Sequence, residues 1–240
     1  MPAAGRGARS MTKSDIAQGL SLLDSFIGQT EMLMGVAPIR FITVGGMLSV
    51  SLFENRSTTK DIDFLLDPSV DAVQEYRDEV LHMIRLVGET LAFNEDWMND
   101  ELRIFVRRAG RLSLFLRSVE QGLVAHRGRN LVVYAARLDF ALERKLRRLG
   151  EDLGRARDPD LSDAVTLVHR LKAGGHPLSW AYVRALDDNE FGLLVGDRGI
   201  DATAREYINV YGSQGIVETQ WDEEAKRYRY KGLEGEWVHM

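Results

Sequence analysis

Two aspartates separated by one residue, Asp61 and Asp63, are the strongest candidates for chemistry in this sequence. They lie in the segment 61–66, Asp-Ile-Asp-Phe-Leu-Leu, where carboxylates alternate with apolar residues as in a half-buried β-strand. Alternate side chains of a strand project to the same side, about 6.6 Å apart. Two carboxylates held that close repel each other unless a cation lies between them. Magnesium, which proteins bind through carboxylates and substrate phosphates, is the usual cation, so the pair predicts a Mg²⁺ (or Mn²⁺) site.

A glycine pair, Gly45-Gly46, precedes the aspartates at the junction of two predicted elements. The apolar run 39–44 predicts a buried strand, and 47–54 predicts a short helix. Glycine allows a ligand to approach the backbone closely, and the N-terminus of a helix offers N–H groups to phosphate. The glycine pair therefore predicts the place where the phosphates of a nucleotide would lie.

The elements that must position these residues form an α+β pattern. Helices are predicted at 14–34, behind Ser14 as N-cap, and at 69–92, with the polar loop 55–60 leading into the acidic strand. Further short strands are predicted at 102–107, 112–119 and 131–135.

The later half of the chain has a helical pattern from about 137 to 173, broken near 158–159, and again at about 201–211. It ends in an aromatic tail that contains Trp221, Tyr228, Tyr230 and Trp237. We expect a disordered tail at 1–13, a core at 14–136 and a mainly helical region at 137–240.

Composition excludes several classes of protein. The 240 residues contain no cysteine, so disulfides and zinc–thiolate sites are impossible, and a reducing, cytoplasmic location is expected. No run approaches the roughly 20 apolar residues of a membrane-spanning helix, so no membrane partner is expected. The net charge of −5 argues against a uniformly basic nucleic-acid-coating surface.

The predicted order of this part of the chain is a strand, Gly-Gly, a short helix, a polar loop with arginine and threonine, and then Asp-Ile-Asp-Phe. This order resembles that of the polymerase-β-type nucleotidyltransferases. Within that superfamily the chain is most similar to the AbiEii-like toxins and their relatives. The resemblance covers about 14–173 and is specific only in the first motif. It implies a polymerase-β-like core, a mixed sheet flanked by helices, followed by a helical C-terminal portion.

The resemblance also implies roles for particular residues. Asp61 and Asp63 would bind the metal, and Lys145, with Asp160 and Asp163, would complete the catalytic set by neutralising phosphate charge and orienting the lysine or the acceptor. The residues implied to bind the NTP are Gly45, Gly46, Ser49, Arg56, Thr59 and Lys60. The implied reaction is Mg²⁺-dependent transfer of a nucleoside monophosphate from an NTP to an RNA (a tRNA), protein or small-molecule acceptor, as in a toxin-like enzyme.

The sequence departs from this family at the third carboxylate of the metal site. That acid is expected on a strand after the long helix, near Ser113, where the sequence has Arg-Leu-Ser-Leu-Phe. Glu120 and Glu101 are the nearby substitutes. The segment 96–100, Asp-Trp-Met-Asn-Asp, also looks like one found in some relatives. The alternative function is accordingly a catalytically degenerate member that binds a nucleotide or a partner.

A second alternative, a small helical ribonuclease, depends on the loose pattern of Arg77 and His82. Five residues along a helix place the two side chains roughly 140° apart, which disfavours that pairing. The sequence contains neither a P-loop nor a G-x-S-x-G motif, so P-loop kinases and serine hydrolases have no support.

Overall fold

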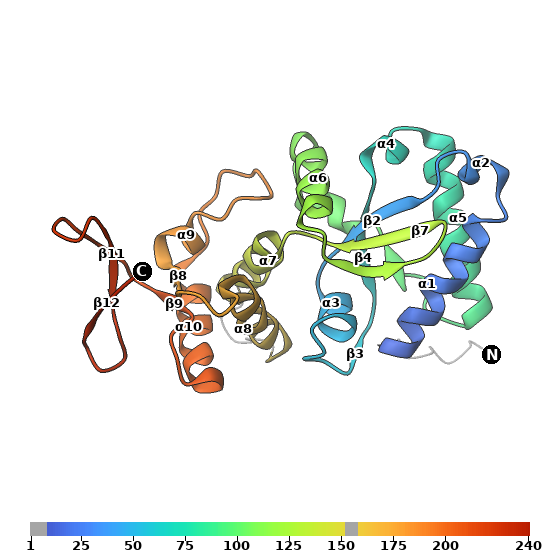
Figure 1. Ribbon diagram of the computed structural model, residues 1–240. Coiled ribbons are helices and arrows are strands. Elements are labelled where there is room, and N and C mark those ends of the chain that lie inside the picture. The colour runs from blue at the N-terminus through green and yellow to red at the C-terminus, as the bar shows by residue number, and fades with distance from the viewer. Residues whose placement is uncertain (1–8, 152–157) are drawn as a thin grey trace. The chain divides into compact units, whose positions relative to one another are not determined.

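A computed structural model describes residues 9–151 and 158–240 of the chain. The chain divides into two compact units, 1–137 and 138–240, and the expected boundary after residue 136 lies next to this division. The first unit is α+β, with a mixed five-stranded sheet flanked by helices (Figure 1). In the described residues, no helix is long and apolar enough to cross a lipid bilayer.

The sheet of the first unit has the strand order β5-β4-β2-β7-β6. The central strand β2 pairs with β4 in antiparallel and with β7 in parallel orientation, while β5 is parallel to β4 and β6 antiparallel to β7. The strands are β2 (Ile39–Thr43), β4 (Ile62–Leu66), β5 (Met98–Asn99), β6 (Val124–Arg127) and β7 (Leu131–Ala135). A separate two-stranded sheet joins β1 (Met11–Thr12) to β3 (Thr58–Thr59).

Successive side chains of β2 point to opposite faces of the sheet. Ile39 and Phe41 are fully buried in the core with α1 (Lys13–Ile27) and α5 (Gln74–Leu91). Arg40 points the other way, with its guanidinium 5.7 Å from the ring centroid of Phe115 on α6 (Arg111–Gln121). Figure 1 shows α1 and α6 on different sides of the strands. The short helices of this unit are α2 (Glu31–Met34), α3 (Gly46–Ser51), α4 (Pro68–Asp71), η1 (Glu101–Phe105) and η2 (Arg108–Gly110).

The predictions of strands at 102–107 and 112–119 are wrong. These segments form η1, η2 and α6. Leu112, Leu114 and Leu116 alternate with other residues as they would in a strand. Only Leu114 is buried, whereas Leu112 and Leu116 are about half exposed, so the alternation does not mark a buried face.

The expected disordered tail also ends earlier than residue 13. Met11 is buried in the core and its strand pairs with β3, while Thr12 rather than Ser14 is the N-cap of α1. The Thr12 side chain accepts a hydrogen bond from the Asp15 N–H, and the Asp15 carboxylate accepts one from the Thr12 N–H. This reciprocal capping box fixes the start of the helix. Residues 1–8 lie outside the described part of the chain.

The second unit contains four helices and five short strands in its described residues. Its helices are α7 (Leu138–Glu151), α8 (Asp158–Lys172), α9 (Trp180–Arg184) and α10 (Asp197–Tyr211). The break is predicted near 158–159, where α8 begins, and residues 152–157 lie outside the described part of the chain. The helix α10 packs on α7, where a side chain at Gly199 would collide with the backbone of Leu146.

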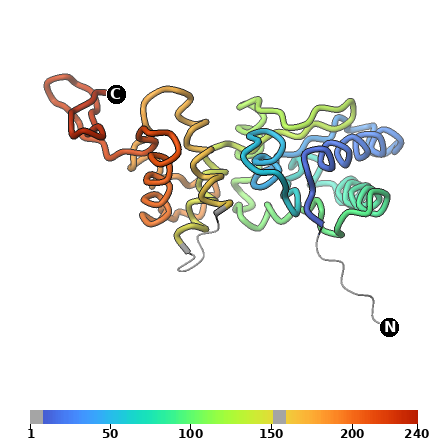
Figure 2. The backbone as a smooth tube through the Cα atoms, turned by 90° about the horizontal axis from the view of Figure 1, so that it is seen from below, coloured from blue at the N-terminus to red at the C-terminus, as the bar shows by residue number. Residues whose placement is uncertain are grey.

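The aromatic tail is part of a β-structure. β8 (Leu178–Ser179) pairs in parallel with β9 (Ile216–Val217). The strands β10 (Gln220–Asp222), β11 (Arg227–Lys231) and β12 (Trp237–His239) form an antiparallel meander. Figure 2 shows this meander, in dark red, beside rather than among the helices of the unit.

Candidate functional site

The predicted acid pair lies at the start of β4. Ile62 and Phe64 are buried, whereas Asp61 and Asp63, which alternate with them, are half-buried. The alternation expected from the sequence is therefore present. Ile62 belongs to the core on the α1 side, which directs the two aspartates toward the opposite face of the sheet. In the described part of the chain, neither carboxylate forms an ion pair.

The ionisation of Asp61 reflects this crowding. Burial raises its pKa above the ordinary value, the carboxylate of Asp63 raises it further, and those of Asp96 and Glu101 add to the effect. Lys60 opposes it by favouring the charged form. A site of this kind disfavours its own negative charge and is stabilised by a cation.

The glycine turn lies against the acid pair. Gly45 has φ +72° and ψ −139°, a backbone conformation that favours glycine, and a Cβ built there would lie 3.6 Å from the Oδ2 atom of Asp63. At Gly46 a Cβ would lie only 2.0 Å from the Oγ1 atom of Thr59. The turn between β2 and α3 therefore packs directly on the loop and strand that carry the aspartates.

The other residues expected to bind the nucleotide support this turn from around it. The Ser49 hydroxyl donates to the Gly45 carbonyl at 3.3 Å, and the Ser49 carbonyl accepts the N–H of Arg56 at 3.4 Å. The Thr59 hydroxyl donates to the Asp61 carbonyl at 3.3 Å. Ser49 and Thr59 are buried, so their contacts indicate a structural role. Lys60 is exposed beside the acid pair.

The strand that was expected to carry a third carboxylate near Ser113 is not formed, because Ser113 lies on the helix α6. The strand that follows the long helix and pairs with β4 is β5, where Asn99 is the register partner of Asp63. Glu120, in the last turn of α6, is exposed. Glu101 is close enough to Asp61 to raise its pKa. Among the residues that the structure describes, no group of three His, Cys, Asp or Glu side chains is arranged to hold a metal ion.

Trp97 explains how the segment 96–100 reaches the site. The indole is completely buried, donates its Nε1–H to the Ile84 carbonyl at 3.0 Å, and packs where Gly19 and Gly88 leave room. The Trp97 carbonyl accepts the Ile62 N–H at 2.8 Å, which fixes β5 beside the acid pair. The sequence singled out this segment by resemblance, but its pairing register could not be predicted.

Lys145 and its two predicted partners form one cluster within the second unit. The ammonium lies 2.7 Å from the Oδ1 atom of Asp160 and 2.6 Å from the Oδ2 atom of Asp163. Arg148 adds a contact of 2.9 Å to Asp160, and all of Lys145 is buried except for 4% of its surface. This geometry holds the lysine in place, and its predicted role toward phosphate stays a prediction.

Arg77, one of the two residues of the ribonuclease alternative, is held by two carboxylates. Arg77 is bound by the carboxylates of Asp71 and Asp100, at 3.0 and 2.5 Å. These contacts hold α4 and the start of η1 to α5, so Arg77 has a structural role.

No protein-family model matches this chain, and no curated protein and no solved structure was found to be similar to it.

Proposed function

We propose that the protein is a metal-dependent nucleotidyltransferase, which transfers a nucleoside monophosphate from an NTP to a hydroxyl or phosphate of an RNA, protein or small-molecule acceptor. The observation that supports this function most strongly is the contact between the glycine turn and the acid pair, with Gly45 against Asp63. Phosphates lying on the turn would be within reach of a cation on the two carboxylates. This proximity is what phosphoryl-type transfer needs, because its catalysis is mostly positioning and charge neutralisation.

The donor set fits Mg²⁺ in one respect. Mg²⁺ is usually held by one or two carboxylates together with substrate phosphates, rather than by a cage made only of protein. Asp61 and Asp63 provide two such carboxylates, and the negative surroundings that raise the pKa of Asp61 favour a cation. When bound, the metal would activate the attacking oxygen and neutralise the charge of the leaving pyrophosphate.

The chain's own residues would then orient the NTP. The absence of a side chain at Gly45 leaves the backbone beside Asp63 open to the phosphates, whereas Gly46 makes room for the Thr59 side chain. Lys60, exposed beside Asp61, would add positive charge on the solvent side. Ser49 and Thr59 would act indirectly, by holding the turn and the loop in place.

A second candidate function is nucleotide binding without transfer. It is favoured by Asn99, which lies opposite Asp63 in the strand register, where a carboxylate would complete a two-metal site. An amide there is neutral and a weaker metal ligand than a carboxylate.

Incubation with each NTP labelled in its α-phosphate, with Mg²⁺ and either total RNA or total protein, tests the transferase directly. We expect label to be transferred to one acceptor class and the transfer to be lost in Asp61→Asn and Asp63→Asn. Asp78→Asn, an exposed aspartate on α5, is the matched control and should keep the activity. Mg²⁺-dependent NTP binding without label transfer would favour the second function, and no NTP binding at all would contradict both.

A further inference from the structure

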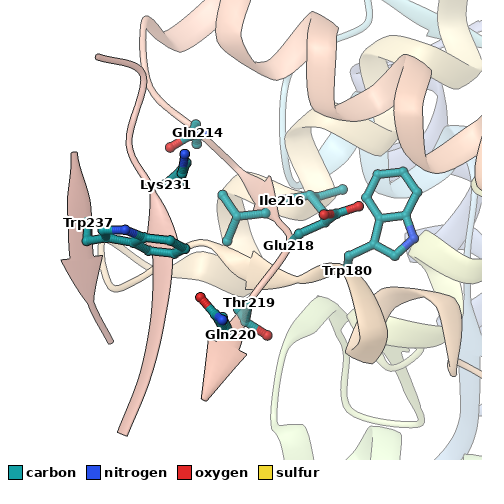
Figure 3. A pocket seen from close by; sticks show the side chains of 9 residues that line it. Trp180, Gln214, Ile216, Glu218, Thr219, Gln220, Lys231 and Trp237 are labelled. Atoms are coloured by element: carbon teal, nitrogen blue, oxygen red, sulfur yellow. The ribbon is translucent and has the colours of Figure 1, made fainter. Parts of the chain in front are cut away.

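The second unit has a pocket that the acid pair and the glycine turn do not use. Its volume is about 540 Å³, within the range of roughly 300–1,000 Å³ found for small-molecule sites. It is lined by residues of α9 and β9 and by one face of the β10–β12 meander (Figure 3). Ile216 and Val217, which are 6% and 5% exposed, provide its apolar part.

Two indole rings stand at opposite ends of this pocket: Trp237 on β12 and Trp180 at the start of α9 (Figure 3). Trp237 is 46% exposed. Its orientation is fixed by two cations, because the Arg229 guanidinium and the Lys231 ammonium lie 4.3 and 5.5 Å from its ring centroid. Arg229 is paired with Asp222 at 3.1 Å, so Lys231 is the cation of the pocket lining that can meet a negatively charged group of a planar ligand.

The polar groups of the pocket are of the types that recognise a nucleobase and a phosphate. Lys231 and Glu218 both line it, and neither forms an ion pair among the residues described. The amide of Gln214 lies on the same side as Lys231, and Thr219 and Gln220 lie on the other side (Figure 3). Amides, hydroxyls and carboxylates form hydrogen bonds with base edges, and single-stranded RNA is read by such bonds together with stacking on aromatic rings.

We propose that this pocket binds one unpaired nucleotide. The base would stack on the indole of Trp237, the Gln214 amide would bond its edge, and Lys231 would pair with its phosphate, while Trp180 would close the far end of the pocket. The same chemistry is offered by a free nucleoside monophosphate and by an unpaired nucleotide of an RNA strand. This binding is independent of whether the acid pair performs transfer.

Calorimetric titration of the full chain tests the proposal with three probes: the four nucleoside monophosphates, single-stranded RNA pentamers, and the same pentamers in a duplex. We expect binding of the monophosphates or the single strands, and none of the duplex, whose bases are already stacked. Affinity for the monophosphates equal to that for the strands would assign the site to a free nucleotide, and much tighter binding of the strands would assign it to RNA.

Matched variants locate the binding. Trp237→Ala should weaken it by roughly tenfold, as loss of one stacking partner does. Trp180→Ala should weaken it less, because Trp180 lies at the other end of the pocket. Trp221→Ala is the control, because Trp221 is 43% exposed in the same meander but pairs with Tyr228 on the other sheet face, outside the pocket. Circular dichroism would verify that the meander is folded in each variant.

The phosphate contact has its own signature. With a single-stranded pentamer, one contact contributes about −0.7 to the slope of log affinity against log salt concentration, and Lys231→Ala should remove that contribution. Lys226→Ala, in the turn between β10 and β11, should leave it unchanged. The proposal is overturned if neither monophosphates nor single strands bind at millimolar concentration, or if Trp221→Ala weakens binding as much as Trp237→Ala. It is also overturned if a phenylalanine-containing peptide binds to this pocket and nucleotides do not.

Discussion

Two pairs of aspartates in this chain differ in how their negative charge is balanced. Asp160 and Asp163 lie one turn apart on α8 and share the buried ammonium of Lys145, at 2.7 and 2.6 Å. Asp61 and Asp63 lie two residues apart at the start of β4, and no ion pair with either is present among the described residues. The α8 pair is balanced by the protein itself, whereas the β4 pair raises the pKa of Asp61 through burial and mutual repulsion.

The difference separates a structural charge cluster from a candidate ligand site. A buried charge is tolerated when it is paired and hydrogen-bonded, and removal of its partner is costly. A like-charged pair without a counter-ion lowers stability unless a ligand provides the opposite charge. We therefore expect the variants of the two pairs to change stability in opposite directions.

The largest expected effect is that of Lys145→Ala. It leaves two buried carboxylates without their shared cation, which should lower the free energy of unfolding by about 3–5 kcal/mol. Urea denaturation measures the loss. Lys226→Ala removes a lysine from an exposed pair with Glu223 and should change the stability little. A small effect of Lys145→Ala would mean that the α8 pair is not a structural cluster.

Asp163→Asn should lower the free energy of unfolding by a smaller amount, about 1.5–3 kcal/mol, the usual value of one charged hydrogen bond. The amide keeps the shape of the side chain and loses its charge. The double variant with Lys145→Ala should be less destabilised than the sum of the two single changes, because both remove the same contact. Additive losses would show that the two side chains are not coupled.

Gly46→Ala changes the turn beside the β4 pair. Its Cβ would lie 2.0 Å from Thr59 Oγ1 and 2.7 Å from Thr59 Cβ, so β3 must shift, at a cost of about 1–3 kcal/mol. The shift should also weaken NTP binding. Gly35→Ala, where a Cβ would have only an ordinary contact of 3.6 Å, is the control and should do neither. Unchanged NTP affinity in Gly46→Ala would place the phosphates elsewhere.

Asp61→Asn should have the smallest effect on stability and the opposite sign. Without metal we expect a gain below about 1 kcal/mol at neutral pH, because the carboxylate is half-exposed and solvent screens its repulsion. Since the folded state raises the pKa of Asp61, it holds the proton more tightly than the unfolded chain, so stability falls as the pH rises from the ordinary pKa of 3.8 through the raised value. The variant should lose this part of the pH dependence in thermal melts, and a destabilised variant would contradict the repulsion.

Local patterns predicted the central elements of the fold. The strands at 39–43 and 62–66 and the buried side chains between the aspartates follow from apolar alternation, which depends only on neighbouring residues. The contacts of Lys145 with Asp160 and Asp163 agree with the grouping that the resemblance implied, although not with exposure to a phosphate.

Features that depend on distant residues were not predictable. The alternation of Leu112, Leu114 and Leu116 indicated a strand, but the segment belongs to the helix α6, whose buried side chains are Leu114, Phe115 and Ser118. The partner of Asp63 is Asn99, on a two-residue strand held by Trp97, and such a short pairing leaves no periodic signal. Met11 and Thr12 pair with β3, a contact with residues more than forty positions away that local patterns do not reveal.

Titration calorimetry with a non-hydrolysable NTP, with and without Mg²⁺, tests most directly whether Asp61 and Asp63 bind the metal of a Mg²⁺–nucleotide complex. Wild type and the Asp78→Asn control should bind the NTP only with Mg²⁺, and Asp63→Asn should lose that Mg²⁺-dependent binding. Equal NTP affinity with and without Mg²⁺, or an Asp63→Asn protein that keeps the full Mg²⁺ dependence, would contradict the assignment of Asp61 and Asp63 as metal ligands.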